Sequence, residues 1–231
     1  MPRPPELSHR AVALQPSLTL EISAKAKALR DAGQDICSLS AGEPDFETPA
    51  FIVKAAQDAL AQGFTRYGPA AGDPELRAAI AEKLSTENQI PTRPEEVLVT
   101  NGGKQAIYNL FQVLLNPGDE VLIPGPYWLS YPEMASLAGA TTTIVPSIAT
   151  TGFSLDLDAL EARIRPNSKL LVINSPGNPT GRVMAKSELE ALAELMTRHP
   201  QLMVMSDEIY EYLLDDGEQH HSIAGSADGL R

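Results

Sequence analysis

The second half of the sequence alternates short, nearly all-apolar runs with longer stretches that mix apolar and polar residues. A short apolar run is typical of a strand buried on both faces, whereas apolar residues at helical spacing indicate an amphipathic helix. The predicted strands cover residues 97–99, 121–123, 141–145, 170–173 and 202–205, and the predicted helices cover residues 104–115, 130–138, 156–165 and 186–199. This alternation predicts a doubly wound, mostly parallel α/β sheet with helices on both faces.

Residues 1–90 lack this alternation and are expected to contribute little to the sheet. Helices are predicted over residues 17–32, 49–63 and 74–88, with a short strand over residues 36–40. The expected end signals are Gly33 after the first helix, Thr48 before the second and Asp73 before the third. Loops rich in glycine and proline, residues 42–46 and 66–72, interrupt this region.

Composition and charge exclude several classes of protein. The 231 residues are 43% hydrophobic and 21% charged, as in folded globular proteins, and the net charge of −12 disfavours binding to nucleic acid. No apolar run reaches the length of a membrane span. Cys37 is the only cysteine and the four histidines are dispersed, so neither an internal disulfide nor a metal site is predicted. We therefore expect a cytoplasmic protein without nucleic-acid or membrane partners.

Gly102, Gly103 and Lys104 form the turn between the predicted strand at residues 97–99 and the helix that follows. In an open parallel sheet, ligands bind beyond the carboxyl ends of the strands, where this turn is expected. Two glycines let backbone N–H groups approach an anion at the start of the helix, and Lys104 adds positive charge. An ordinary Gly-Gly turn before a helix explains the segment equally well.

Three more unusual segments follow predicted strands. Trp128 is the only tryptophan, and a lone tryptophan is more often a core residue than a ligand platform. Asn178 lies in a loop with two prolines and two glycines, where its amide could face the crevice or complete an Asx turn. Asp207 ends the last predicted strand and Tyr210 follows it, and Asp207 alone is more simply read as a helix N-cap.

The four segments together favour one ligand over the separate structural explanations. They place an anion site, an aromatic surface, an amide and a carboxylate at one edge of the sheet, which suits a planar, phosphorylated ring that contains nitrogen. The roles would be phosphate binding by Gly102, Gly103 and Lys104, stacking by Trp128, contact with a protonated ring nitrogen by Asp207, and contact with a ring oxygen by Asn178 and Tyr210. Pyridoxal 5′-phosphate has all of these groups.

Six motifs are in register with those of one known family. They are residues 40–46, 66–68, 102–105, 126–128, 174–181 and 206–210. In combination they resemble the fold-type-I pyridoxal-phosphate aminotransferases, most closely the bacterial aspartate aminotransferases of class I. The resemblance implies a homodimer in which Tyr67 reaches the phosphate of the neighbouring subunit. It also implies that Gly42, Trp128 and Asn178 contact the amino-acid substrate.

The same resemblance implies amino-group transfer between an amino acid and a 2-oxo acid. Residues 1–45 would form an N-terminal arm with part of the small domain, and residues 46–231 an incomplete large domain that binds pyridoxal phosphate. Lys104, with Ser17 and Thr19, would favour an acidic substrate such as aspartate or glutamate. The charge of Lys104 is explained equally well if Lys104 contacts only the phosphate or only solvent.

The sequence departs from the family after Asp207. The family has a lysine there that forms the Schiff base with the cofactor, but residues 208–231 contain no lysine. No catalytic residue is therefore assigned, and we expect a truncated chain that lacks the C-terminal small domain and is inactive alone. Its strand at residues 97–99 would lack a partner and its strand at residues 170–173 would have an open edge, so we expect instability or association.

Two other functions remain open. Lyase or synthase chemistry on the same cofactor would use the same motifs. The missing half, which would hold the Schiff-base lysine and the carboxylate-binding arginine, would distinguish such an enzyme from an aminotransferase. A non-catalytic fragment that binds pyridoxal phosphate or a partner subunit is the alternative from a different class.

Overall fold

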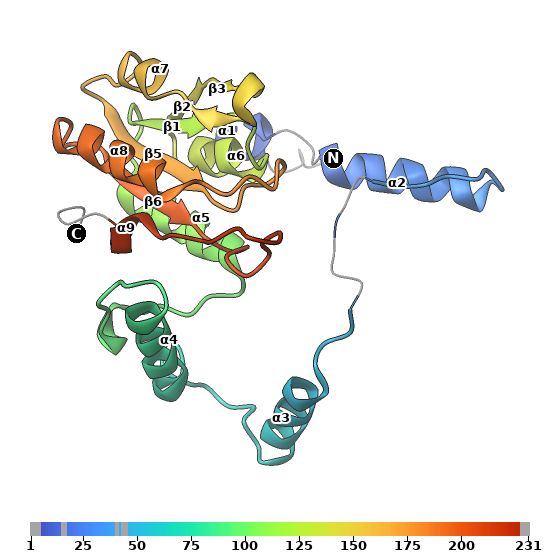
Figure 1. Cartoon of the computed structure of the whole chain (residues 1–231). Helices are drawn as coiled ribbons and strands as arrows, with labels where there is room; N and C mark the ends of the chain where they lie inside the picture. The colour runs from blue at the N-terminus through green and yellow to red at the C-terminus, as the bar shows by residue number, and fades with distance from the viewer. Residues whose placement is uncertain (1–5, 15–17, 40–41, 43–45, 227–231) are drawn as a thin grey trace. The chain divides into compact units, whose positions relative to one another are not determined.

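The computed structural model of the chain describes residues 6–14, 18–39, 42 and 46–226 (Figure 1). Contacts within the chain define two units, one of residues 15–68 and one that joins residues 1–14 to residues 69–231. The larger unit contains both sheets. In the part of the chain that is described, no helix combines the length and the apolar character needed to cross a bilayer.

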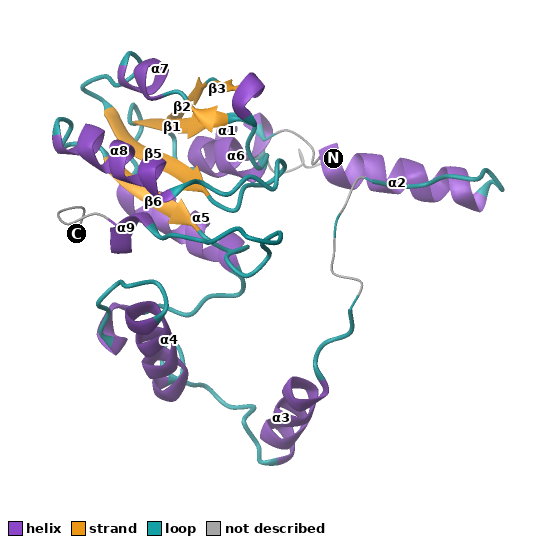
Figure 2. Ribbon diagram, in the orientation of Figure 1, coloured by secondary structure: helices purple, strands orange, loops and turns teal. Residues whose placement is uncertain are grey.

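A four-stranded parallel sheet forms the centre of the larger unit (Figure 2). Its strands are β1 (Glu120–Pro124), β2 (Thr141–Val145), β5 (Ser168–Asn174) and β6 (Met203–Asp207), in the order β2-β1-β5-β6. All three pairings are parallel. The predicted α/β class and the last four predicted strands are therefore confirmed.

Buried side chains alternate between the two faces of this sheet, as the period of a strand requires. On one face, residues of β1 and β5 pack against α5 (Gly103–Leu114) and α6 (Ser130–Leu137); the members include Val121, Ile123, Leu170, Val172, Phe111 and Tyr131. On the other face, the intervening residues pack against α7 (Leu157–Glu161) and α8 (Lys186–Thr197); the members include Leu122, Leu171, Ile173, Leu160, Leu189 and Leu192. Burial on both faces explains why the strand sequences are continuously apolar.

Residues 97–99 are not a strand, which corrects that prediction, whereas the expected lack of a strand partner is confirmed within the described chain. This segment has an extended backbone, but no strand pairs with it within the described chain, and the N–H of Val99 donates to the carbonyl of Ala71. It follows η1 (Pro94–Glu96), and the apolar run reflects partial burial rather than sheet pairing. A short antiparallel hairpin of β3 (Ser147–Ile148) and β4 (Ser154–Leu155), joined through η2 (Ala149–Thr151), escapes prediction because its strands are too short for a periodic signal.

The predicted open edge at residues 170–173 is also wrong. These residues belong to β5, which pairs with β1 on one side and with β6 on the other. Among the described strands, β6 is the one on this side of the sheet with a single neighbour. The expectation that the chain associates therefore concerns β6.

Several helix ends follow the predicted signals. Asp73 caps α4 (Pro74–Thr86) by accepting hydrogen bonds from the backbone N–H groups of Glu75 and Leu76, at 2.9 and 3.1 Å. Asp156 likewise caps α7, which ends at Glu161, earlier than predicted. Two short helices, α1 (His9–Ala13) and α9 (Ile223–Ser226), complete the larger unit.

The smaller unit contains α2 (Leu18–Asp31) and α3 (Ala50–Ala61). Gly33 follows α2 with a φ of 84°, the left-handed conformation expected of a helix stop. Pro49 occupies the N-cap of α3 without a side-chain hydrogen bond, so the predicted cap at Thr48 is wrong. Residues 36–39 are not a strand, which corrects that prediction, and Ser40 lies outside the described residues.

Candidate functional site

A cavity of about 280 Å³ opens where β6 ends and α5 begins. It brings together seven residues that the sequence analysis selects for the cofactor: Gly102, Gly103, Lys104, Trp128, Asn178, Asp207 and Tyr210. Parallel strands deliver their carboxyl ends to one edge of the sheet, so segments more than a hundred residues apart meet here. Asp207 and the Gly102–Gly103 turn therefore line one cavity, as the cofactor hypothesis requires.

The turn before α5 forms the first wall of the cavity. Gly102 has a φ of 79°, which a side chain would strain, and the helix starts at the next residue. The N-terminus of a helix of this length carries unpaired N–H groups and a partial positive charge that suit an anion. The ammonium of Lys104 lies 4.9 Å from the centre of the Trp128 ring, so it adds its charge on the same side.

Asp207 forms the second wall, and its carboxylate is held in place. Its Oδ2 accepts a hydrogen bond of 2.6 Å from the hydroxyl of Tyr131, and its Oδ1 accepts one of 3.3 Å from the N–H of Ile209. Its backbone carbonyl accepts from the Asn174 side chain at 2.9 Å and from the N–H of Ser175 at 3.2 Å. Asp207 is therefore anchored at the end of β6 rather than free to follow solvent.

Tyr131 is the fixed partner of that carboxylate. Its side chain is 1% exposed, and its ring meets the Trp128 ring edge-on at 5.3 Å between centres. Burial, and then the hydrogen bond to Asp207, raise the pKa of the Tyr131 phenol far above its usual range. The phenol therefore remains a hydrogen-bond donor to Asp207 across the physiological pH range.

The loop after β5 forms the third wall. The Asn174 Oδ1 accepts a hydrogen bond of 2.8 Å from the N–H of Asn178, which shapes the loop from within. The Asn178 Nδ2 then donates to the hydroxyl of Tyr210 at 3.4 Å. This bond joins the two side chains assigned to the ring oxygen, as the sequence analysis places them.

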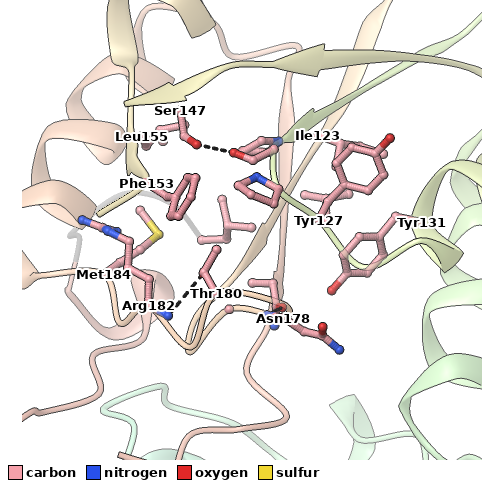
Figure 3. A pocket seen from close by; sticks show the side chains of 17 residues that line it. Ile123, Tyr127, Tyr131, Ser147, Phe153, Leu155, Asn178, Thr180, Arg182 and Met184 are labelled. Atoms are coloured by element: carbon pink, nitrogen blue, oxygen red, sulfur yellow. Dashed lines mark hydrogen bonds between the residues drawn. The ribbon is translucent and has the colours of Figure 1, made fainter. Parts of the chain in front are cut away.

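A second, smaller hollow of about 70 Å³ adjoins the first and shares Tyr131, Asn174 and Asn178 with it. Figure 3 shows it between the rings of Phe153 and Tyr127, with Thr180 and Arg182 below them. It contains three of the residues of the first cavity but neither the Gly102–Gly103 turn nor Asp207. The larger cavity is therefore the candidate site.

The other residues selected from the sequence lie in the smaller unit. Gly42 and Tyr67 belong to residues 15–68, and the Tyr67 side chain is fully exposed. Ser17 lies outside the described residues, and Thr19 is part of α2. Their roles at the substrate and at a neighbouring subunit stay predictions.

Sequence reasoning missed four residues of the cavity wall: Ile107, Tyr131, Asn174 and Ile209. Tyr131 and Asn174 are the more important, because they hold Asp207. Asn174 starts the predicted 174–181 motif and could have been selected from it. Tyr131 sits among the buried residues of α6, where only the fold reveals that its hydroxyl meets a residue 76 positions away.

Comparison with known proteins agrees with the geometry. The family model described as "Aminotransferase class I and II" matches residues 34–230. The chain therefore belongs to the class I and II aminotransferases. It is 52% identical over 212 residues to the aspartate/prephenate aminotransferase of Thermus thermophilus, and 45% identical over 226 residues to the aspartate aminotransferase of Bacillus subtilis.

Solved structures give the same answer. The aspartate aminotransferase of Thermus thermophilus with maleate superposes with a TM-score of 0.91 at 50% identity, over 96% of this chain and 58% of that one. The aspartate aminotransferase of Rhizobium meliloti gives 0.93 at 36% identity, over 97% and 56%. The alignments with the two curated relatives cover 92% and 98% of this chain but 55% and 57% of those proteins. The chain thus spans about half the length of the relatives it matches.

Proposed function

We propose that this chain binds pyridoxal 5′-phosphate and carries the cofactor-binding part of an aminotransferase. The reaction would move an amino group between an amino acid, aspartate or glutamate, and a 2-oxo acid. The observation that carries the proposal is that Asp207, Trp128 and the Gly102–Gly103 turn line one cavity. The family to which the chain belongs uses this cofactor, and the relatives named above are aspartate aminotransferases or an aspartate/prephenate aminotransferase.

The donors and acceptors of the cavity fit the cofactor. A phosphate suits the N-terminus of α5 beside Lys104, and a planar ring suits the face of Trp128. A protonated pyridine nitrogen needs an acceptor, and Asp207 supplies a carboxylate already oriented by Tyr131. The amide of Asn178 and the hydroxyl of Tyr210 suit a ring oxygen.

When bound, pyridoxal phosphate supplies the electron sink for carbanion chemistry. Asp207 keeps the proton on the ring nitrogen, and the Tyr131 hydroxyl keeps Asp207 in place. Trp128, which lines the cavity, would support one face of the ring and screen it from water. In a homodimer, Tyr67 of a second copy would add a contact to the phosphate.

The missing lysine limits what residues 1–231 do alone. No lysine follows Asp207 in this sequence, and among the described residues Lys104 is the lysine that lines the cavity, at the phosphate end. We therefore propose that these residues bind the cofactor without the covalent tether and that turnover requires a lysine supplied by a longer chain.

Binding is testable because the only tryptophan lines the cavity, so intrinsic fluorescence reports on it. The probe is pyridoxamine 5′-phosphate, which has no aldehyde and does not react with surface lysines. We expect saturable quenching in the 231-residue chain and at least about tenfold weaker binding in Asp207→Ala, which loses a charged hydrogen bond. The matched control is Asp215→Ala, which removes an exposed acid elsewhere.

Two results would overturn the proposal. One is the absence of saturable quenching, and the other is equal affinity in wild type and Asp207→Ala. A separate assay with aspartate, 2-oxoglutarate and pyridoxal phosphate should give no turnover by the 231-residue chain. A single site-specific adduct trapped by borohydride would contradict the claim that no Schiff-base lysine is present.

The substrate class is tested at Lys104. In the presence of pyridoxamine phosphate, Lys104→Ala should weaken the binding of maleate more than the binding of a monocarboxylate. The reason is that a second carboxylate loses its nearest cation among the residues of the cavity. Equal losses of affinity for maleate and for the monocarboxylate would indicate that Lys104 contacts the phosphate and not the substrate.

A further inference from the structure

The segment after β6 has residues in two different surroundings. Asp207, Ile209 and Tyr210 line the cavity. Glu208 and Glu211 make their hydrogen bonds with residues that do not line it. The segment, called the strap below, therefore has the cavity on one side and a cluster of hydrogen-bonded polar residues on the other.

Apolar packing does little to hold this strap. The side chains of Ile209, Tyr212 and Leu213 are 65%, 70% and 65% exposed. Tyr210 itself has the 3.4 Å contact with Asn178, which is at the long limit for a hydrogen bond. This long contact is a weak restraint on the position of the Tyr210 hydroxyl.

Glu208 is the first anchor. Its carboxylate accepts hydrogen bonds from the hydroxyls of Ser206 and Ser222, at 2.6 and 2.8 Å, and contacts the His220 Nε2 at 3.0 Å. The His220 side chain is 9% exposed and that of Glu208 is 16% exposed, so water competes weakly for these bonds. Glu208 thus ties the start of the strap to residues 220–222.

Glu211 is the second anchor. Its carboxylate accepts from the ammonium of Lys83 and, at 2.8 Å, from the side-chain amide of Asn88. Burial opposes ionisation of Glu211, but the hydrogen bonds from Lys83 and Asn88 outweigh it and lower the pKa of this carboxyl. Glu211 thus ties the strap to the end of α4.

Backbone bonds show that the anchors act on Tyr210. The N–H of Glu211 donates to the carbonyl of Glu208 at 3.0 Å, and the N–H of Leu213 donates to the carbonyl of Tyr210 at 2.8 Å. Glu208 and Glu211 are the ends of one turn with Tyr210 inside it. A carboxylate is thus anchored at each end of the turn that carries Tyr210.

We propose that Glu208 and Glu211 are positioning residues for Tyr210, which hold its hydroxyl where it meets the ring oxygen of the cofactor. This inference rests on the proposed function. Neither glutamate touches the cavity, so each acts through the turn rather than on the cofactor.

The test separates positioning from general stability with two ligands. Quenching of Trp128 measures the affinity for pyridoxamine 5′-phosphate and for its analogue without the ring hydroxyl. Glu208→Ala and Glu211→Ala should weaken the first about fivefold, the value of one hydrogen bond, and the second less than twofold. Tyr210→Phe should give the same pattern, and adding Glu211→Ala to it should cost little more.

Conservative and control variants keep the test sharp. Glu208→Gln keeps an acceptor for both serines, so its affinity for pyridoxamine 5′-phosphate should lie between that of wild type and that of Glu208→Ala. Glu190→Ala, an exposed acid on α8, should change neither affinity. If the alanine variants do not fold, Glu208→Gln and Glu211→Gln carry the comparison.

Amide hydrogen exchange over residues 207–214 supplies a readout that needs no cofactor. We expect these amides to exchange faster than in wild type in both alanine variants, and at the wild-type rate in Glu190→Ala. Equal loss of affinity for both ligands, or unchanged exchange, would overturn the positioning role while leaving cofactor binding intact. If the wild type binds neither ligand, the proposed function fails, and exchange alone decides whether the glutamates anchor the turn.

Discussion

Replacement of Tyr131 by phenylalanine tests how the fold holds Asp207. The change removes one oxygen from a side chain that is 1% exposed, and it leaves the ring in place against Trp128. The oxygen donates a 2.6 Å hydrogen bond to a carboxylate, and bonds of this kind contribute about 1.5–3 kcal/mol. Asp207 is partly exposed, so water replaces some of that loss. We therefore expect the free energy of unfolding to fall by about 2 kcal/mol.

Equilibrium unfolding in urea, followed by Trp128 fluorescence, measures this difference. The control is Tyr127→Phe, which makes the same chemical change at a half-buried tyrosine whose hydroxyl has no hydrogen bond to any described residue. The control should lie within about 0.5 kcal/mol of wild type, as substitutions without a lost contact usually do. Equal effects of the two substitutions would refute the claim that Tyr131 acts through Asp207.

Three further predictions concern packing, charge and assembly. Gly72→Ala should destabilise the chain by about 1–3 kcal/mol in thermal melts, because its Cβ would lie 2.6 Å from the Val99 side chain and its φ is 107°; Gly68→Ala, which has open space, should not. Hydrogen bonds, first from Arg198, lower the pKa of Glu161 from 4.5 to about 2, so their stabilising effect should be lost as pH falls through that interval. The free energy of unfolding of Glu161→Gln should therefore change less with pH in that interval than that of wild type. An unchanged dependence on pH would contradict this role of Glu161. Sedimentation should show self-association of the chain, and a monomer that melts cooperatively would contradict the importance of the free β6 edge.

The sequence predicts the elements better than it predicts their partners. Continuous apolar runs identify β1 and β5, which are buried on both faces, whereas the outer strands β2 and β6 are less apolar and only partly buried. The run at residues 97–99 looks the same, but an apolar run reports burial and says nothing about a neighbour for hydrogen bonding. The position of the open edge fails for the same reason, since the order of strands depends on contacts between distant segments.

In the candidate site, the residues assigned to the cofactor were predictable from the sequence, but those that support them were not. The rule that ligands bind at the carboxyl ends of parallel strands is sufficient to bring Gly102, Trp128, Asn178 and Asp207 together. It gives no information about what supports them. Tyr131 lies on a helix and looks like an ordinary core residue in the sequence.

The cluster of Glu208, Glu211 and His220 was likewise not predictable from the sequence. The four histidines are dispersed along the chain, yet one of them, His220, lies within 4.8 Å of two carboxylates once the strap after β6 folds back.

The order of the strands has a consequence for synthesis of the chain. β1 and β2 come first in the chain and are neighbours in the sheet; β5 follows and lies on the other side of β1, and β6 lies on the other side of β5. Each new strand is therefore added to an outer flank, and none has to be inserted between strands that are already paired. Up to Asp207, the order of the described strands therefore allows the sheet to grow in the order in which a ribosome releases them.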